Sequence, residues 1–114
     1  MSEAGVILIG EMHGLVGRHG ELEQLLGALA AGTREEPGCV AYHVASLPEP
    51  GEYLVVGTWR DEAALRSHYS TPAYARYRGA VGELLARPSD VVVHRIGSTV
   101  HARDPNPPEP GLLG

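Results

Sequence analysis

The chain has 114 residues, of which 43% are hydrophobic and 20% charged, and this length and composition are typical of one soluble globular domain. Its formal net charge is −5, and all nine of its basic residues are arginines. A surplus of acid repels the phosphate backbone of nucleic acids and anionic membrane surfaces, so we expect neither as a partner. The single cysteine cannot form a disulfide within the chain, and no apolar run is long enough for a membrane span or a signal peptide, which predicts a cytoplasmic protein.

The first third of the chain predicts a strand followed by a helix. Residues 6–13 (VILIGEMH) form an apolar run bounded by glycine, which is typical of a strand. The glycines of residues 14–20 lack the spacing of a phosphate-binding loop, so we interpret this segment as a flexible connection. A helix is expected from Glu21 to just before Pro37, because leucines repeat at helical spacing along one face: Leu22, Leu25, Leu26 and Leu29.

Two acidic residues, Glu35 and Glu36, lie at the C-terminal end of this predicted helix. The helix dipole disfavours an anion there by about 0.3–1 kcal/mol. We therefore expect another group to hold at least one of these carboxylates, either Arg34 or an arginine across a dimer interface.

The middle of the chain predicts a β-hairpin and then two short helices. Residues 39–47 and 53–60 are rich in β-branched and aromatic side chains and are joined by a Pro- and Gly-containing turn, which is typical of antiparallel strands. Asp61 can cap a helix that runs to Tyr69. Thr71 can cap another, which Pro72 opens and which we expect to continue to about Ala86.

A last strand over residues 90–96 completes the order β-α-β-β-α-β, with the second helix split in two. This order predicts an α+β, ferredoxin-like fold with a four-stranded antiparallel sheet. The last strand carries Val91, Val92 and Val93 and is therefore apolar on both faces. Helices cover only one face, so we expect two sheets to pack face to face in a homodimer, a dimeric α+β barrel. The domain should span residues 1–101, and residues 102–114 should be a Pro-rich flexible tail.

The aromatic and basic residues of the second half are the candidate site. Trp59 ends the third strand on the same face as Gly57, which leaves space beside the indole ring. His68 can accept a proton near neutral pH. The alternative for Trp59 is a packed core residue, and the alternative for His68 is a surface or hydrogen-bonded, semi-buried histidine. Further candidates for substrate binding lie on the two short helices, and they are Leu65, Tyr74, Tyr77 and Arg78.

The remaining chemistry-bearing residues do not predict a metal site. The six histidines show no metal-binding motif and there is no cysteine pair, so we expect no metal. A structural metal stays open only at His43 and His94, which lie on strands that could be close in space.

Three segments together resemble the antibiotic biosynthesis monooxygenase family: residues 33–42 (TREEPGCVAY), 53–68 (YLVVGTWRDEAALRSH) and 70–72 (STP). The resemblance extends over about residues 6–97. It implies a small homodimer that oxidises an anthrone or quinol with O2 and needs no metal, flavin or haem. It also implies a substrate pocket between helices and sheet, with Trp59 in its wall.

Two departures from the family pattern bear on the chemistry. Some anthrone-oxidising relatives have a tyrosine early in the helix after the tryptophan, where this chain has Ala63, Ala64 and Leu65. Related haem-degrading dimers use an asparagine on the first strand, and residues 6–13 contain none. We therefore predict a cofactor-independent monooxygenase with Trp59 and His68 as catalytic residues and a small aromatic compound and O2 as substrates. A haem-binding or haem-degrading dimer and a non-catalytic small-molecule-binding dimer are the alternatives.

Overall fold

The computed structural model describes residues 4–100, and the predicted flexible tail and the domain boundary at residue 101 lie outside this range. The elements follow in the order β1 (Val6–His13), α1 (His19–Arg34), β2 (Cys39–Ser46), β3 (Glu52–Trp59), α2 (Glu62–His68), α3 (Pro72–Val81), a 3-10 turn (Gly82–Leu84) and β4 (Asp90–Arg95). This order confirms the predicted ferredoxin-like α+β arrangement, including the split second helix.

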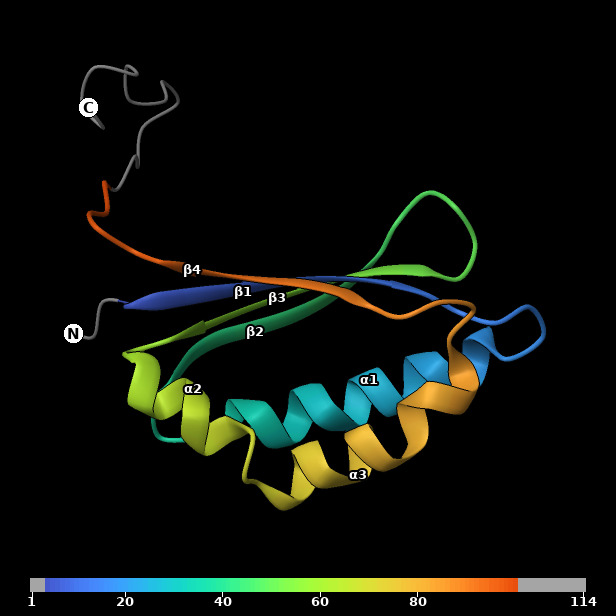
Figure 1. Cartoon of the computed structure of the whole chain (residues 1–114), viewed down its shortest axis with the longest axis horizontal. Coiled ribbons are helices and arrows are strands. Elements are labelled where there is room, and N and C mark those ends of the chain that lie inside the picture. The colour runs from blue at the N-terminus through green and yellow to red at the C-terminus, as the bar shows by residue number, and fades with distance from the viewer. Residues whose placement is uncertain (1–3, 101–114) are drawn as a thin grey trace.

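The four strands form one antiparallel sheet in the order β2-β3-β1-β4. Figure 1 shows all the helices on the same side of this sheet, with α1 and α3 lying side by side. The other side of the sheet carries no helix. β4 is an edge strand, and each of its residues is exposed.

The ends of two helices differ from the predicted ones, and hydrogen bonds explain both. α1 begins at His19, two residues early: the backbone N–H of Leu22 donates to the carbonyl of Arg18, and the side chain of Arg18 pairs with Glu21 in the first turn. α3 ends at Val81 because the chain then turns back to the end of β1. There Leu84 accepts a hydrogen bond from the backbone of Leu15. The periodicity of hydrophobic residues does not reveal this hydrogen bond, because Leu15 and Leu84 lie far apart in the chain.

The predicted helix caps are confirmed. The side chain of Asp61 accepts a hydrogen bond of 2.8 Å from the backbone N–H of Ala64 at the start of α2. Thr71 accepts one of 3.2 Å from the backbone N–H of Tyr74 at the start of α3. Each cap satisfies a backbone donor that the first helical turn leaves unpaired.

The core lies between α1 and the helix-facing side of the sheet. The buried face of α1 presents Leu22, Leu26 and Leu29, and alternate residues of β3 are buried against it, among them Tyr53, Val55 and Trp59. In residues 4–100 no helix is long and apolar enough to cross a membrane.

Candidate functional site

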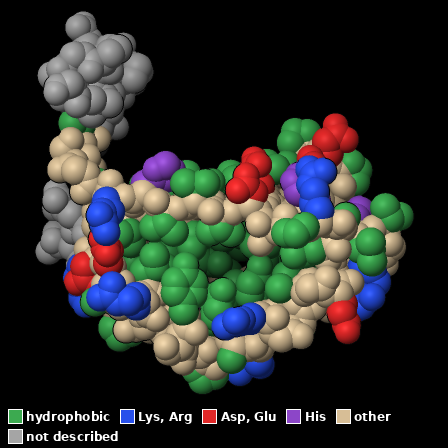
Figure 2. All heavy atoms as spheres, viewed as in Figure 1, with side chains coloured by type: hydrophobic (Ala, Val, Ile, Leu, Met, Phe, Trp, Pro, Cys, Tyr) green, Lys and Arg blue, Asp and Glu red, His purple; other side chains and the backbone are tan. Residues whose placement is uncertain are grey.

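A cavity of about 370 Å³ lies between the sheet and the helices α2 and α3. Figure 2 shows hydrophobic side chains gathered in a hollow between the sheet and the helix layer. The lining has an apolar part, made by Leu8, Met12, Leu29, Val55, Val81 and Val91. Its polar groups are Tyr42, His68, Tyr69, Tyr74, Tyr77, Arg78 and Ser89. An apolar enclosure with a few converging polar groups is the usual form of a small-molecule site.

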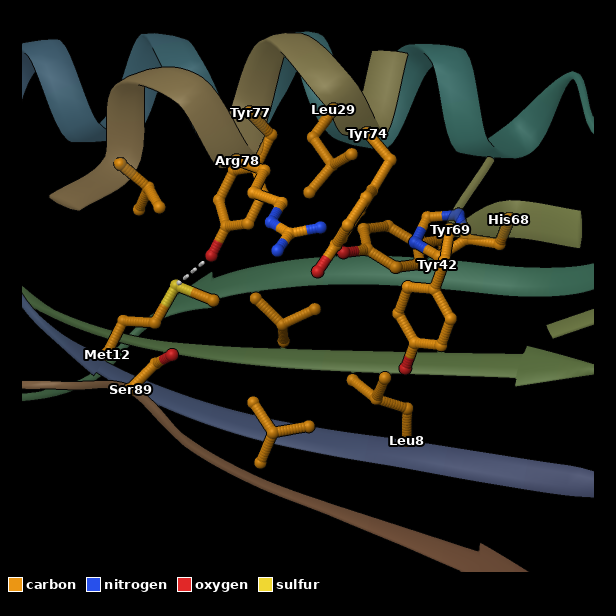
Figure 3. A pocket seen from close by; sticks show the side chains of 13 residues that line it. Leu8, Met12, Leu29, Tyr42, His68, Tyr69, Tyr74, Tyr77, Arg78 and Ser89 are labelled. Atoms are coloured by element: carbon orange, nitrogen blue, oxygen red, sulfur yellow. Dashed lines mark hydrogen bonds between the residues drawn. The ribbon is translucent and has the colours of Figure 1, made fainter. Parts of the chain in front are cut away.

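His68, the last residue of α2, lies in the middle of an aromatic cluster. Its ring centroid is 4.9 Å from that of Trp59, 5.1 Å from that of Tyr74 and 5.4 Å from that of Tyr69. Figure 3 shows Tyr74 and Tyr77 extending from α3 towards the sheet, while His68 lies beside Tyr42 and Tyr69. The imidazole is therefore held by flat rings on several sides, and only 2% of its surface is exposed.

Glu36 connects His68 to Trp59. Its Oε1 accepts a hydrogen bond of 3.0 Å from the indole Nε1 of Trp59, and its Oε2 lies 2.7 Å from Nδ1 of His68. The side chain of Glu36 is 11% exposed. Our expectation that a carboxylate at the end of α1 needs a partner is confirmed, but its partners within the chain are Trp59 and His68, and the choice of Arg34 is wrong. Arg34 instead donates from Nε to the backbone carbonyl of Tyr42, at 2.9 Å.

The second ring nitrogen of His68, Nε2, is available to a ligand. Within residues 4–100 it has no hydrogen-bond partner, and no buried side-chain nitrogen or oxygen there is left without one. His68 lines the cavity, so Nε2 is the ring nitrogen left to bind a ligand there. A carboxylate only accepts hydrogen bonds, so Glu36 holds the hydrogen on Nδ1 and leaves the lone pair on Nε2. This arrangement suits a general base.

Burial raises the pKa of three cavity tyrosines, Tyr42, Tyr69 and Tyr77, so their hydroxyls keep the proton at neutral pH. Burial raises the pKa of Tyr77 to about 12, with a further contribution from Tyr74. Burial also raises the pKa of Tyr42 far above its ordinary value, and that of Tyr69 to a lesser extent. Each hydroxyl can therefore donate a hydrogen bond to an oxygen of a bound molecule. The hydroxyl of Tyr77 meanwhile points at Met12 Sδ, 3.6 Å away.

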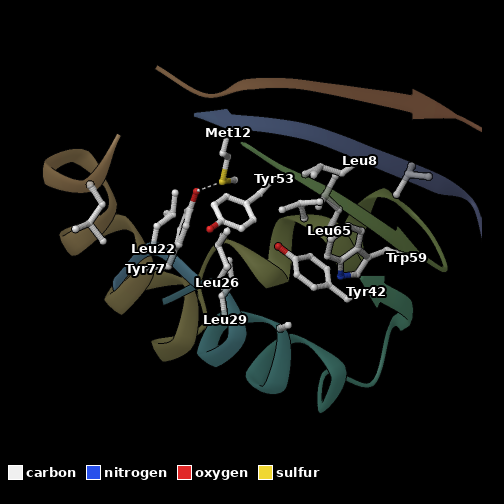
Figure 4. Packing of buried hydrophobic residues seen from close by; sticks show 14 residues of the cluster. Leu8, Met12, Leu22, Leu26, Leu29, Tyr42, Tyr53, Trp59, Leu65 and Tyr77 are labelled. Carbon is white, nitrogen blue, oxygen red and sulfur yellow. Dashed lines mark hydrogen bonds between the residues drawn. The ribbon is translucent and has the colours of Figure 1, made fainter. Parts of the chain in front are cut away.

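The structure brings four of the predicted site residues together at the cavity: His68, Tyr74, Tyr77 and Arg78. The other three do not line it. Trp59 is fully buried beside Tyr42 in the core (Figure 4) and does not line the cavity, so the wall position implied by the family resemblance is not what the geometry shows. Gly57 instead makes room for the indole ring, and Leu65 is part of the core. A catalytic role for Trp59 stays a prediction.

Three important residues were not predicted from the sequence. Tyr69 was expected only as the last residue of a helix, but α2 ends at His68 and the chain turns, so Tyr69 packs on Tyr74 with ring centroids 5.0 Å apart. Tyr42 reaches the cavity from β2, where strand alternation could have indicated its inward direction. For Glu36 the sequence held one indication of a special role, namely a negative charge at the C-terminal end of a helix, where the helix dipole disfavours it.

The possible metal site at His43 and His94 is not formed by the sheet of one chain. These histidines lie on β2 and β4, which are the two opposite edges of the sheet. Within the described part of the chain, no three side chains of His, Cys, Asp or Glu are grouped as metal ligands.

The chain is similar in sequence to the model of one protein family and to proteins from two organisms. The model of the family described as "Antibiotic biosynthesis monooxygenase" matches residues 5–80. A Mycobacterium tuberculosis protein named "Putative monooxygenase Rv0793" is 40% identical over 72 residues, which are 63% of this chain and 71% of that protein. The Synechocystis protein sll1783, called uncharacterized, is 32% identical over 68 residues, 59% of this chain and 46% of its own length.

Solved structures agree with this result. The structure of Rv0793 matches with a TM-score of 0.81 and 32% identity, covering 86% of this chain and 100% of that one. PA3566 from Pseudomonas aeruginosa matches with a TM-score of 0.76 and 25% identity, covering 86% and 99%. The cavity, the fold and the sequence thus point the same way, and the chain belongs to the antibiotic biosynthesis monooxygenase family.

Proposed function

We propose that the protein is a cofactor-independent monooxygenase that oxidises a hydroxylated aromatic compound, of the anthrone or quinol type, with O2. The observation that carries the proposal is His68, which lines an aromatic cavity while its Nδ1 is bound to Glu36, so that Nε2 is the ring nitrogen left for a substrate. Family membership supports the reaction type. The flat tyrosine rings favour a planar substrate.

The proposed reaction begins with proton transfer from the substrate to Nε2 of His68. The resulting anion is a far better electron donor than the neutral molecule, so it can reduce O2 without a metal or flavin. In an anthrone, a ring CH2 group becomes a carbonyl: one oxygen atom enters the product, and the other leaves as water with the two hydrogens. The substrate supplies all four electrons that reduce the two oxygen atoms of O2, because its carbon changes from CH2 to C=O.

Groups around the cavity can stabilise the substrate anion. The hydroxyls of Tyr42 and Tyr77 are donors, because their raised pKa values keep them protonated. Arg78 lies exposed on α3 in the lining of the cavity, and within residues 4–100 it forms no ion pair. Its guanidinium can approach a negative oxygen at the cavity mouth.

Oxygen uptake by the metal-stripped protein tests this proposal, with a hydroxyanthrone and with reduced menadione as substrates and autoxidation subtracted. We expect turnover without added cofactor, a roughly 100-fold or greater loss in His68→Gln, and a smaller loss in Arg78→Ala. Arg76→Ala is the matched control, since Arg76 is exposed on the same helix but does not line the cavity. No uptake above background with either substrate would contradict the proposal. A Soret band after hemin addition that His68→Gln abolishes would favour the haem-binding alternative.

We also propose that the protein works as a homodimer joined through the helix-free side of the sheet. Ile9 lies opposite Val56 on β3 and Val92 on β4, so the three side chains form an apolar row on that side. Ile9 is 37% exposed and Val92 46%. An apolar sheet face is costly in water, and packing two such faces together is the common solution.

Light scattering after size exclusion tests the dimer. Ile9→Asp places a charge in the middle of the row and should give a folded monomer. Val16→Asp is the control, because Val16 is 88% exposed in the loop before α1 and away from the strands. A wild-type protein that elutes as a monomer, or an Ile9→Asp variant that stays dimeric, would contradict this interface.

A further inference from the structure

We propose that Glu36 is the positioning residue of this site: it fixes the tautomer of His68, and Trp59 contributes to the chemistry through Glu36 and not as a wall of the cavity. The inference deepens the proposed function and rests on it for the identity of the base. It can still be tested without any oxygen chemistry.

The hydrogen bonds leave one arrangement. The indole Nε1 of Trp59 can only donate, so it occupies Oε1 of Glu36 at 3.0 Å. The other oxygen, Oε2, remains for Nδ1 of His68 at 2.7 Å. Each oxygen of the carboxylate then accepts from one ring, and the imidazole must carry its hydrogen on Nδ1.

The three side chains have little freedom to choose other partners. Trp59 and His68 are 0% and 2% exposed. The backbone of Glu36 is held on both sides, because its N–H donates to the carbonyl of Thr33 at 3.0 Å and its carbonyl accepts from Cys39 at 3.1 Å. The carboxylate is thus aimed by the turn that follows α1, and rotation towards solvent would leave two buried donors unpaired.

Electrostatics give Glu36 a second effect. Within residues 4–100, its carboxylate forms no ion pair with an arginine, and the imidazole of His68 is its charged partner only when protonated. When Nε2 takes a proton from the substrate, an imidazolium–carboxylate pair forms at this short distance in a mostly dry site. The pair stabilises the charge that develops on His68, as an orienting carboxylate does in other His-dependent enzymes.

A base positioned in this way should move protons even when O2 is absent. An anthrone loses a carbon-bound proton to Nε2, and the C–H electron pair moves into the ring system and onto the carbonyl oxygen, giving the enolate. Return of a proton to the same carbon restores the anthrone. Nothing is oxidised or reduced, and in D2O the only net change is replacement of hydrogen by deuterium.

The first experiment determines the tautomer directly, by nitrogen-15 NMR of the histidine rings in mildly alkaline buffer. The signals of His68 are assigned by their loss in His68→Gln. We expect the Nδ1–H form in the wild type. In Glu36→Gln the side-chain oxygen accepts the hydrogen bond from Trp59, so the side-chain NH2 group points at Nδ1 of His68. Because NH2 donates, Nδ1 must accept, and the imidazole should change to the Nε2–H form. Glu35→Gln is the matched control, because Glu35 is exposed and lies one residue away.

The second experiment measures deuterium exchange into an anthrone under anaerobic conditions. We expect Glu36→Gln to lower kcat roughly 10- to 100-fold, to change KM little, and Glu35→Gln to match the wild type. An Nε2–H tautomer of His68 in the wild type overturns the inference, even if Glu36→Gln does not fold. An unchanged rate of deuterium exchange in a folded Glu36→Gln variant also overturns it. If the tautomer and the exchange behave as expected but no substrate consumes O2, the oxygenase proposal fails and the role of Glu36 stands.

Discussion

The close fit between Gly57 and two aromatic rings allows a quantitative prediction. A Cβ atom at Gly57 would lie 2.6 Å from Cη2 and Cζ3 of Trp59 and 2.8 Å from Cδ1 of Tyr42. Both rings are buried, at 0% and 3% exposure, and they pack edge to face at a centroid distance of 5.9 Å. Neither ring has space to move aside, so Gly57→Ala should overpack the core.

Gly10 provides the matched control on the neighbouring strand β1. A Cβ atom there would approach Val91 Cγ2 no closer than 3.5 Å, which is an ordinary contact. Neither glycine has a positive φ, so both backbones accept alanine. Replacing glycine by alanine stabilises by about 0.4–1 kcal/mol through the unfolded chain, and this gain cancels between the two variants. The difference in unfolding free energy is then the overpacking cost, about 1–3 kcal/mol.

Urea denaturation followed by circular dichroism measures this difference, with all variants at one protein concentration because a dimer is stabilised by mass action. At a slope of about 2 kcal/mol per M, Gly57→Ala should unfold at a urea concentration about 0.5–1.5 M below that of Gly10→Ala. Equal midpoints, or a more stable Gly57→Ala, would refute the reasoning that Gly57 exists to seat the indole. A displaced indole would also weaken the bond from Trp59 to Glu36, so oxygen uptake should fall in Gly57→Ala and not in Gly10→Ala.

Three further predictions concern stability and titration. Trp59→Phe keeps a buried ring but removes the donor to Oε1 of Glu36, and it should cost about 1.5–3 kcal/mol in urea denaturation; a loss below about 0.5 kcal/mol would mean that the bond adds nothing. Thr71→Ala removes the cap that accepts from the backbone of Tyr74, and it should lower stability by about 1 kcal/mol while Thr71→Ser largely retains it. In a spectrophotometric titration, Tyr77 should ionise near pH 12, well above the value of about 10 for tyrosine in the unfolded chain. Because the folded-state pKa of Tyr77 is raised, the contribution of its neutral hydroxyl to stability is complete below pH 10 and is lost as the pH rises towards 12. Tyr77→Phe should remove the ionisation near pH 12 from the titration curve.

The sequence alone determined the fold to within a few residues at most element ends. Hydrophobic spacing, turn residues and caps are local signals, and residues 6–13, Asp61 and Thr71 behave in the structure as these signals predict. The sequence also singled out His68, Tyr74, Tyr77 and Arg78, because polar and aromatic groups on an inward-facing helix side tend to surround a site. The cytoplasmic location and the flexible tail stay predictions.

Only the tertiary structure decided how the site is connected. Glu36 follows α1, Trp59 ends β3 and His68 ends α2, and they meet because the strand order places these three element ends at one corner of the molecule. Residues 23 and 32 positions apart have no periodic relation that a sequence pattern could reveal. The family resemblance implied Trp59 in the wall of the cavity, but side-chain packing decides where the indole lies: it fills the space over Gly57 and bonds to Glu36, outside the lining of the cavity.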